Sequence, residues 1–276
     1  MDNSFVIIGG DDRQKYLYEE MKRKNYPVNM VFNSYETEPQ KAFDIIMNAG
    51  VVILPIPTTK DSINLFTKIP EQIVPLSQIK SKINSEAVVF YGGNSGEYLC
   101  KKAINLLEYE PYVLYNAMAT AEAAVSLIID KTELTIFDSQ IIILGYGRIA
   151  KILAAYLKAL NANVTVCARR ESARYEAEVN GFNSISFEGL SQQMQLADVV
   201  VNTVPKMVIG KRELLSAGED ILILDLASAE GGVDYKAAKT FGVKAVHALS
   251  LPGKMSPKSA GMYIEKSVSK IISTIY

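Results

Sequence analysis

The sequence feature that most constrains the fold is a strand–turn–helix–strand unit over residues 141–170. Residues 141–144 read Ile-Ile-Ile-Leu, a short apolar, β-branched run that is typical of a buried parallel strand. Residues 145–150 then read Gly-Tyr-Gly-Arg-Ile-Ala, the G-x-G-x-x-A pattern. In this pattern the first glycine allows a tight turn and the second lets a pyrophosphate approach the backbone. The small sixth residue lets helix and strand pack closely.

The pattern opens a predicted helix, whose N-terminal N–H groups and dipole favour an anion. It is informative here because it lies between a strand and a helix inside a unit of about thirty residues. It predicts a dinucleotide site, with contacts from Gly145, Tyr146, Gly147, Arg148 and Ile149. The alternative is an ordinary strand–turn–helix with two turn glycines.

The end of the next predicted strand indicates which dinucleotide binds. An NAD site usually places Asp or Glu there, where the carboxylate accepts a hydrogen bond from the ribose and repels a 2′-phosphate. This chain has Ala168, Arg169 and Arg170 instead. Guanidinium groups bind phosphate through charge-assisted, bidentate hydrogen bonds. We therefore predict NADP rather than NAD, the alternative being a solvated pair of surface arginines.

Length and composition restrict the class of protein. The 276 residues are enough for two ordinary domains. Lys+Arg 29 against Asp+Glu 30 leave no basic excess, so we expect no nucleic-acid partner. No apolar run reaches the length of a membrane span and the N-terminus does not resemble a signal peptide, so we expect a cytoplasmic protein without a membrane segment. One histidine, and two cysteines without metal-ligand spacing, predict no metal site.

Strands alternate with helices along the whole chain, which predicts two parallel-sheet α/β domains. The N-terminal domain, residues 1–115, has predicted strands at 5–8, 28–32, within 44–54 and at 87–91, and is expected to be flavodoxin- or Rossmann-like. The second, residues 116–258, is a predicted NAD(P)-binding Rossmann domain with further strands at 164–167, 183–187, 198–205, 221–228 and 243–248. We expect residues 251–253 to break this pattern and a last helix, residues 259–276, to pack back on the N-terminal domain.

Residues 117–130 predict a helix that is apolar on almost every face, so we expect it to be buried all round, between the domains and lining their cleft. The hydrogen-bonding or charged groups near its start are Asn116, Thr120 and Glu122. Each is a candidate ligand-binding residue. The alternatives are a Thr120 hydroxyl that bonds to the backbone and a Glu122 carboxylate that simply lies near the helix dipole.

A set of short motifs follows one another in a specific order. They are Ile-Gly-Gly-Asp-Asp-Arg-Gln at 8–14, Asn116 with Thr-Ala-Glu at 120–122, Leu-Gly-Tyr-Gly-Arg at 144–148, Ala-Arg at 168–169, Asn-Thr-Val-Pro at 202–205, Asp-Leu-Ala-Ser at 225–228 with Gly-Gly-Val-Asp at 231–234, and Leu-Pro-Gly at 251–253 with Pro-Lys-Ser-Ala-Gly at 257–261. Their order and spacing resemble the family of dipicolinate synthase A subunits over nearly the whole chain. The chain departs from the family pattern at Ala229 and Glu230, where a basic residue and proline are usual, and at Ala119 and Ala123, where proline and glycine are usual.

The resemblance implies a two-domain enzyme, similar to D-2-hydroxyacid dehydrogenases, that oxidises a dihydrodipicolinate-type product of the lysine pathway to pyridine-2,6-dicarboxylate. It also implies NADP as the acceptor and, as the partner during spore formation, the flavoprotein-like B subunit of dipicolinate synthase. Two rival functions stay open. One is an NADP-dependent 2-hydroxyacid dehydrogenase, against which the absence of arginine from residues 225–230 weighs. The other is a non-catalytic NADP-binding protein that acts through its partner, and a homo-oligomer also stays open.

Candidate site residues follow from this implied chemistry. We expect residues at the ends of the fourth and fifth predicted strands of the second domain to border the cofactor: Thr203, Val204, Pro205, Asp225 and Ala227. A dicarboxylate needs cations, hydroxyls or free N–H groups, for which the candidates are Arg13, Asn116, Thr120, Ser228, Lys254 and Lys258. Aromatisation of the ring needs a proton acceptor, for which Glu122 is the first candidate, with Thr120 and Ser228 as further catalytic candidates. We expect His247 to be a core or edge residue.

Overall fold

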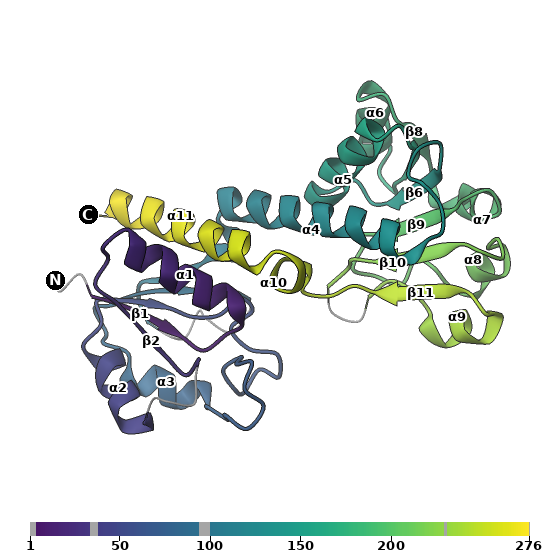
Figure 1. Cartoon of the computed structure of the whole chain (residues 1–276). Coiled ribbons are helices and arrows are strands. Elements are labelled where there is room, and N and C mark those ends of the chain that lie inside the picture. Colours follow the sequence, from purple (N-terminus) through teal and green to yellow (C-terminus); the bar gives the residue numbers. More distant parts are fainter. Residues whose placement is uncertain (1–3, 34–37, 94–99, 229–230, 276) are drawn as a thin grey trace. The chain divides into compact units, whose positions relative to one another are not determined.

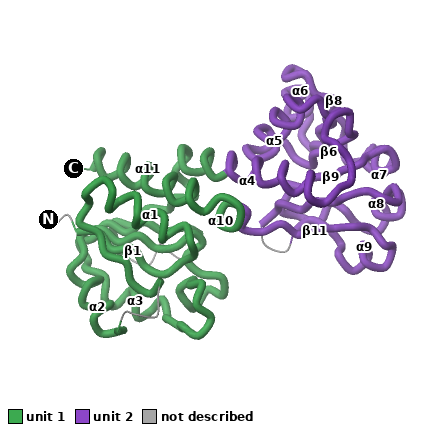
Figure 2. Tube along the Cα trace, viewed as in Figure 1, with its two compact units in different colours: residues 1–116, 252–276 green, residues 117–251 purple. Residues whose placement is uncertain are grey.

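The structure is a computed structural model that describes residues 4–33, 38–93, 100–228 and 231–275. The chain forms two compact units (Figure 2). Each unit is built on one parallel β-sheet. Unit 1 comprises residues 1–116 and 252–276, and unit 2 comprises residues 117–251. The predicted fold class, two parallel-sheet α/β domains, is confirmed.

Unit 1 has a five-stranded sheet in the order β2-β1-β3-β4-β5. This is the flavodoxin-like order, whose switch point lies between the first and third strands. The strands are β1 (Phe5–Ile8), β2 (Val28–Val31), β3 (Val51–Ile53), β4 (Val88–Tyr91) and β5 (Ala103–Asn105). The helical elements are α1 (Asp12–Arg23), α2 (Pro39–Met47), α3 (Leu76–Lys82), the 3-10 turn η1 (Leu106–Glu108), the first part of α4 (Glu110–Lys131), α10 (Leu251–Met255) and α11 (Pro257–Ile275).

Alternate strand residues of unit 1 face opposite sides of its sheet, so each side has its own core. On one side, Phe5 and Ile7 pack with residues of α1 and α11; on the other, Val6 and Ile8 pack with residues of α2 and α3. Helices α1 and α11 lie side by side (Figure 1). Their close approach requires glycine at position 261, where a Cβ would lie only 2.5 Å from a backbone carbonyl oxygen of α1.

Unit 2 has a six-stranded sheet in the order β11-β10-β9-β6-β7-β8. Counted within the unit, this order reverses at its first strand as the Rossmann fold does. The strands are β6 (Gln140–Leu144), β7 (Asn163–Cys167), β8 (Asn183–Ile185), β9 (Val199–Asn202), β10 (Leu222–Asp225) and β11 (Lys244–His247). The helical elements are the rest of α4, α5 (Arg148–Ala159), α6 (Glu171–Val179), the 3-10 turn η2 (Phe187–Gly189), α7 (Leu190–Met194), α8 (Lys211–Leu215) and α9 (Tyr235–Phe241). Residues of α4 and α5 share one core with Ile141 and Ile143, while α7, α8 and α9 share the other with Ile142 and Leu144.

The structure confirms one predicted strand and corrects the interpretation of residues 251–253. The strand predicted within residues 44–54 is β3, and the residues that precede it, up to Met47, form helix α2, in which Ala42 and Ile46 lie one helical turn apart and are both fully buried. Residues 251–253 do not break the pattern but open helix α10, since proline is tolerated in the first turn of a helix. Strand β5 and helix α2 were not predicted. Strand β5 forms one edge of the sheet, and α2 contributes Ala42 and Ile46 to a core of unit 1.

Helix α4 is longer than predicted, since it begins at Glu110, and it is not buried all round. Ala121, Ala124 and Ile128 lie in the core of unit 2, whereas Glu122 is exposed and Ile129 is 58% exposed. By length and composition alone, α4 is apolar enough to cross a membrane. This is weak evidence because a core helix passes the same test, and the three buried residues show that α4 contributes to the core of unit 2.

Candidate functional site

The predicted cofactor residues meet at one edge of unit 2. Strands β6, β7, β9 and β10 are parallel and end in register there, with Leu144 beside Cys167 and Asn202, and Asn202 beside Asp225. The chain runs outward from β6 in both directions, so the strand order reverses between β6 and β9. Open α/β sheets bind ligands outside the carboxyl ends of their strands at such a point.

The turn after β6 leaves room for a pyrophosphate. Gly145 adopts φ +91°, its amide donates to the carbonyl oxygen of Cys167 (2.8 Å), and a Cβ on it would lie 2.7 Å from Oγ1 of Thr203. Gly147 is the N-cap of α5, where no side chain caps the helix. A Cβ on Gly147 would meet nothing within 4 Å. This turn therefore fits a dinucleotide, since the helix N-terminus lacks a side-chain cap and the space beside it is open.

Tyr146 lies between the two glycines, but its side chain is part of the protein interior. It is 8% exposed, its ring lies edge-on to Phe182 with centroids 6.4 Å apart, and its hydroxyl accepts a hydrogen bond from Nδ2 of Asn180 (3.2 Å). Only its backbone remains for the predicted cofactor contact. Of the other predicted turn residues, Arg148 is exposed and Ile149 is half-buried.

The segment after β7 carries two exposed arginines. Ala168 is buried, while the side chains of Arg169 and Arg170 are exposed and form no hydrogen bond or ion pair with the described residues. Arg170 is the N-cap residue of α6. The sequence prediction placed both guanidinium groups at this edge, and the structure leaves both of them available to an anion.

The segment after β9 supports the glycine turn from the neighbouring strand. Thr203 donates both its amide (3.0 Å) and its hydroxyl (2.8 Å) to the carbonyl oxygen of Leu144. Asn202 is fully buried, and its amide side chain holds the segment that follows: Oδ1 accepts from the amide of Val204 (2.9 Å) and Nδ2 donates to the carbonyl oxygen of the same residue (3.1 Å). Pro205 follows as an exposed residue.

Asp225 is fully buried and accepts hydrogen bonds from four groups of unit 2. Its Oδ1 accepts from Nδ2 of Asn202 (2.8 Å) and the amide of Ala227 (3.0 Å); its Oδ2 accepts from the amide of Gly232 (2.7 Å) and the hydroxyl of Tyr235 (2.8 Å). Burial, and then the bond to this carboxylate, raise the pKa of Tyr235 well above its usual range. The carboxylate thus joins three segments of the sheet edge, and its contacts are with the protein itself.

Sequence reasoning missed most of this cluster. His247 is half-buried, as expected for an edge residue, but its Nε2 lies 3.2 Å from the carbonyl oxygen of Ala227 and its ring stacks on Tyr235 with centroids 5.5 Å apart. Gly231 has φ +80°, and a Cβ there would lie 2.5 Å from Oδ2 of Asp225. The Asp-Leu-Ala-Ser and Gly-Gly motifs were a signal for this cluster, but nothing in the sequence indicated that Tyr235 completes it.

The predicted substrate residues are distributed over both units. Arg13, Asn116, Lys254 and Lys258 belong to unit 1, whereas Thr120, Glu122 and Ser228 belong to unit 2. Thr120 is buried, Asn116 is half-buried, and the side chains of Glu122, Ser228, Lys254 and Lys258 are exposed. Because the predicted substrate residues are divided between the two units, neither unit by itself contains all of them. Ala229 and Glu230, where the chain departs from the family pattern, lie outside the described residues.

Arg13 is a buried, paired cation. Its Nε and Nη2 donate to the two carboxylate oxygens of Asp11, each at 2.8 Å, and its side chain is 6% exposed. Burial opposes ionisation of Asp11, but the bonds and charge of Arg13 outweigh it and lower the pKa of Asp11 below its usual range. Burial by itself would lower the pKa of Arg13, but the hydrogen bonds and charge of Asp11 outweigh this effect and raise the pKa of Arg13. Since Asp11 balances the charge of Arg13, this arginine is a weaker anchor for a carboxylate than the sequence suggested.

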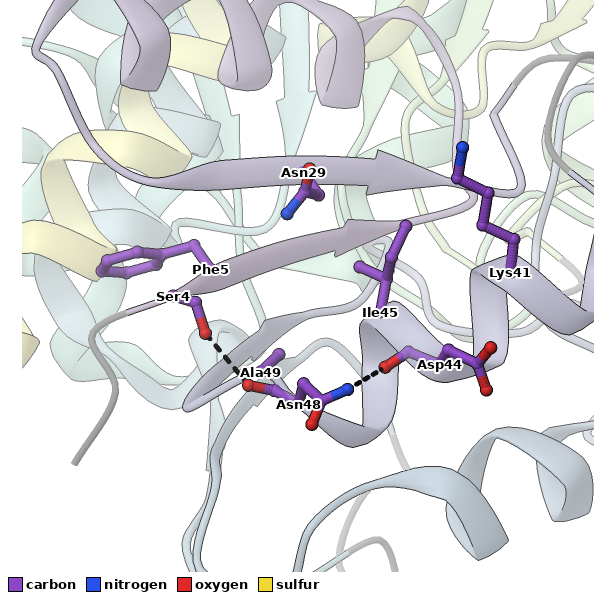
Figure 3. Close-up of a pocket in the computed structure, with 8 residues that line it drawn as sticks. All are labelled: Ser4, Phe5, Asn29, Lys41, Asp44, Ile45, Asn48 and Ala49. Atoms are coloured by element: carbon purple, nitrogen blue, oxygen red, sulfur yellow. Dashed lines mark hydrogen bonds between the residues drawn. The ribbon is translucent and has the colours of Figure 1, made fainter.

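A surface hollow of unit 1 lies away from the carboxyl edge of its sheet (Figure 3). It is lined by Ser4, Phe5, Asn29, Lys41, Asp44, Ile45, Asn48 and Ala49. Phe5 begins β1, Ser4 precedes it and Ala49 precedes β3, so the hollow opens at the amino ends of parallel strands. Ligands of open α/β sheets bind at the opposite, carboxyl ends, so this hollow is not the site. Among the residues that the structure describes, no group of three or more His, Cys, Asp or Glu side chains is arranged to hold a metal ion.

This fold and this edge define an α/β protein whose second unit is a nicotinamide-dinucleotide-binding domain of the dehydrogenase type. Residues 122–227 match the family described as D-isomer specific 2-hydroxyacid dehydrogenase, NAD binding domain, and residues 4–108 match the family of N-terminal domains of dipicolinate synthase A subunits. The chain is 31% identical to the dipicolinate synthase A subunit of Bacillus subtilis (strain 168), over 98% of this chain and 96% of the relative. It belongs to the family of dipicolinate synthase A subunits, as its motifs predicted.

Solved structures agree with this assignment. The crystal structure of the dipicolinate synthase A chain from Bacillus subtilis superposes with a TM-score of 0.86 at 28% identity, covering 100% of this chain and 97% of that one. The dipicolinate synthase A subunit from Bacillus halodurans superposes with a TM-score of 0.84 at 26% identity, covering 98% and 97%. Since these relatives are each one subunit of a synthase, the family assignment implies a partner subunit.

Proposed function

We propose that this protein is the A subunit of a dipicolinate synthase, which uses NADP to oxidise dihydrodipicolinate to pyridine-2,6-dicarboxylate in the cytoplasm during spore formation. The observation that carries the proposal is the likeness to a dipicolinate synthase A subunit along 98% of the chain. The sheet edge of unit 2 supports it, since its turn and its free arginine side chains suit a phosphorylated dinucleotide.

NADP is the proposed cofactor because of the charge at the end of β7. Gly145 and Gly147 would admit the pyrophosphate, and Arg169 with Arg170 would bind the 2′-phosphate through charge-assisted hydrogen bonds. When bound, the nicotinamide would accept the hydride that a dihydropyridine ring loses on aromatisation. The remaining proposed cofactor contacts come from Tyr146, Arg148, Ile149, Ala168, Thr203, Val204, Pro205, Asp225 and Ala227. Tyr146 would contribute its backbone, and Asp225 would act by holding the segments around it.

Substrate binding is proposed for exposed groups rather than for the paired Arg13. Ser228 follows β10 at the cofactor edge, and its exposed hydroxyl can donate to a carboxylate. Lys254 and Lys258 are exposed cations, and Asn116 and Thr120 supply an amide and a hydroxyl on α4. Glu122 is the proposed proton acceptor, since an exposed carboxylate can pass the ring proton on to water. Thr120 and Ser228 would hold the substrate during this transfer.

The flavoprotein-like B subunit of dipicolinate synthase is the proposed partner. The rival function, an NADP-dependent 2-hydroxyacid dehydrogenase, is favoured by the family match of residues 122–227. The other rival is a protein that binds NADP and acts only through its partner. These functions differ in what the purified chain turns over, so one assay separates them.

The assay mixes the purified chain with freshly made dihydrodipicolinate and NADP, with and without the B subunit, and follows NADPH together with the ultraviolet absorbance of pyridine-2,6-dicarboxylate. Formation of both products in equal amounts by the purified chain supports the proposal. Turnover of a 2-hydroxyacid panel, with no dipicolinate formed, would replace it with the dehydrogenase. NADP binding without any turnover, even when the B subunit is added, would leave only the non-catalytic role.

The substrate residues are tested with Thr120→Val, which keeps the shape of the side chain and removes its hydroxyl. We expect NADP affinity to stay at the parent value and kcat/KM to fall by about tenfold to a hundredfold, the effect of losing about one or two kcal/mol of hydrogen bonding. An equal fall in NADP affinity would assign Thr120 to the cofactor instead, and no change in either would remove it from the site.

A further inference from the structure

The side chain of Arg174 forms hydrogen bonds with the backbone of the segment between β7 and α6. It lies within α6, four residues after the N-cap residue Arg170. Its Nη1 donates to the carbonyl oxygens of Ala168 (2.9 Å) and Arg169 (3.1 Å). The sequence pattern indicated Arg169 and Arg170 as phosphate-binding residues, but not this third arginine.

The backbone of this segment is fixed at every residue. The amide of Ala168 donates to the carbonyl oxygen of Ile185 on β8 (3.1 Å), and the carbonyl of Arg170 accepts from the amides of Ala173 (3.1 Å) and Arg174 (3.3 Å). The side chain of Arg174 ties the two carbonyls that remain, those of Ala168 and Arg169. By contrast, the side chains of Arg169 and Arg170 are exposed and form no hydrogen bond or ion pair with other described residues.

This contrast between a fixed backbone and free side chains is what recognition of a phosphate requires. Two long side chains lose much conformational entropy when they bind a phosphate, and a fixed backbone lowers the cost of bringing both to the same point. Arg174 also bonds to carbonyls and not to a carboxylate, so none of these bonds removes positive charge from the segment.

We infer that Arg174 is a positioning residue for the 2′-phosphate. By holding the carbonyls of Ala168 and Arg169, Arg174 fixes the backbone that carries the side chains of Arg169 and Arg170, and so sets the preference for NADP over NAD. The inference rests on the proposed function, because it assigns Arg174 a role only if this edge binds NADP. It predicts that Arg174 acts through Arg169 and Arg170, and it does not require Arg174 to touch the phosphate.

The test is a double-mutant cycle read out by binding. Isothermal titration calorimetry with adenosine 2′,5′-bisphosphate and with 5′-AMP, which differ only in the 2′-phosphate, gives the preference of each variant for the 2′-phosphate without any turnover. The variants are Arg174→Met, the double variant Arg169→Ala/Arg170→Ala, and the triple variant. Arg212→Met changes an exposed arginine on α8 in the same way and is the matched control. Thermal unfolding confirms that each is folded, and Arg174→Gln replaces the methionine variant if that one is not.

We expect Arg174→Met to reduce the preference for the 2′-phosphate by about tenfold, with 5′-AMP affinity and the Arg212→Met control unchanged. In the double-variant background, Arg174→Met should have no further effect. A further tenfold loss there would overturn the inference, because Arg174 would then act on the phosphate by itself. If the parent protein prefers the bisphosphate and the Arg174→Met variant keeps this preference, the inference is overturned while the NADP assignment stands. A parent without preference would overturn the NADP assignment and the inference with it.

Discussion

Replacing Gly147 by valine separates the two uses of the glycine turn, for folding and for binding. Gly147 has φ −90° and ψ −168°, an extended conformation that valine adopts without strain, and a Cβ there meets nothing within 4 Å. The folding cost is therefore that of a poor N-cap residue, about 1 kcal/mol or less. The new side chain would instead fill the space through which a pyrophosphate approaches. We expect NADP affinity to fall by about a hundredfold or more, which corresponds to about 2.7 kcal/mol or more.

Gly145→Ala is the matched control for the fold. At Gly145 φ is +91°, and the added Cβ would lie 2.7 Å from Oγ1 of Thr203, so even alanine is strained and crowded. We expect this variant to lose about 1–3 kcal/mol of unfolding free energy from backbone strain alone. Urea unfolding measures both stabilities, and titration with NADP measures binding. The reasoning would be refuted by a Gly147→Val variant that binds NADP with the parent affinity, or by one that is destabilised as much as Gly145→Ala.

Other predictions follow from the charged and buried groups. Arg169→Ala should weaken NADP binding by about tenfold or more and leave NAD nearly unchanged, since one charge-assisted hydrogen bond contributes about 1.5–3 kcal/mol; equal losses in titrations with both cofactors would contradict the assignment. Asp11→Ala should cost about 3 kcal/mol or more in urea unfolding, because it leaves Arg13 buried without its partner and also removes the N-cap of α1, whereas Asp12→Ala, which removes an exposed bridge, should cost much less; similar costs would show that burial of the pair is unimportant. Burial raises the pKa of Cys167 to about 12. The unfolded chain then releases this proton at lower pH than the folded chain, so the free energy of unfolding should fall as pH rises from about 9 towards 12. Cys167→Ala should make that fall less steep, and an unchanged slope in alkaline urea titrations would contradict the linkage.

The sequence predicted a strand within residues 44–54 but did not show where in this stretch the strand begins. Residues 44–54 contain an apolar run that suits a strand as well as a helix, and short runs of this kind are ambiguous by periodicity. The structure divides them into the end of α2 and strand β3. Helix α4 was misjudged for a related reason. Its composition is apolar on nearly every side, but burial depends on what packs against each side, and Glu122 and Ile129 are exposed.

The sequence by itself determined the two parallel sheets, the turn at 145–147 and the two arginines after β7, because each is encoded in contiguous residues with their own backbone preferences. That these residues bind NADP stays a prediction. Only the tertiary structure decided which polar groups are paired within the protein. Parallel strands bring together residues that are distant in sequence, so Asn202, Asp225, Tyr235 and His247 meet at one edge. Folding likewise paired Arg13 with Asp11 at a helix start, because a buried cation is stable only with a partner, and no residue pattern alone could show that it would be buried.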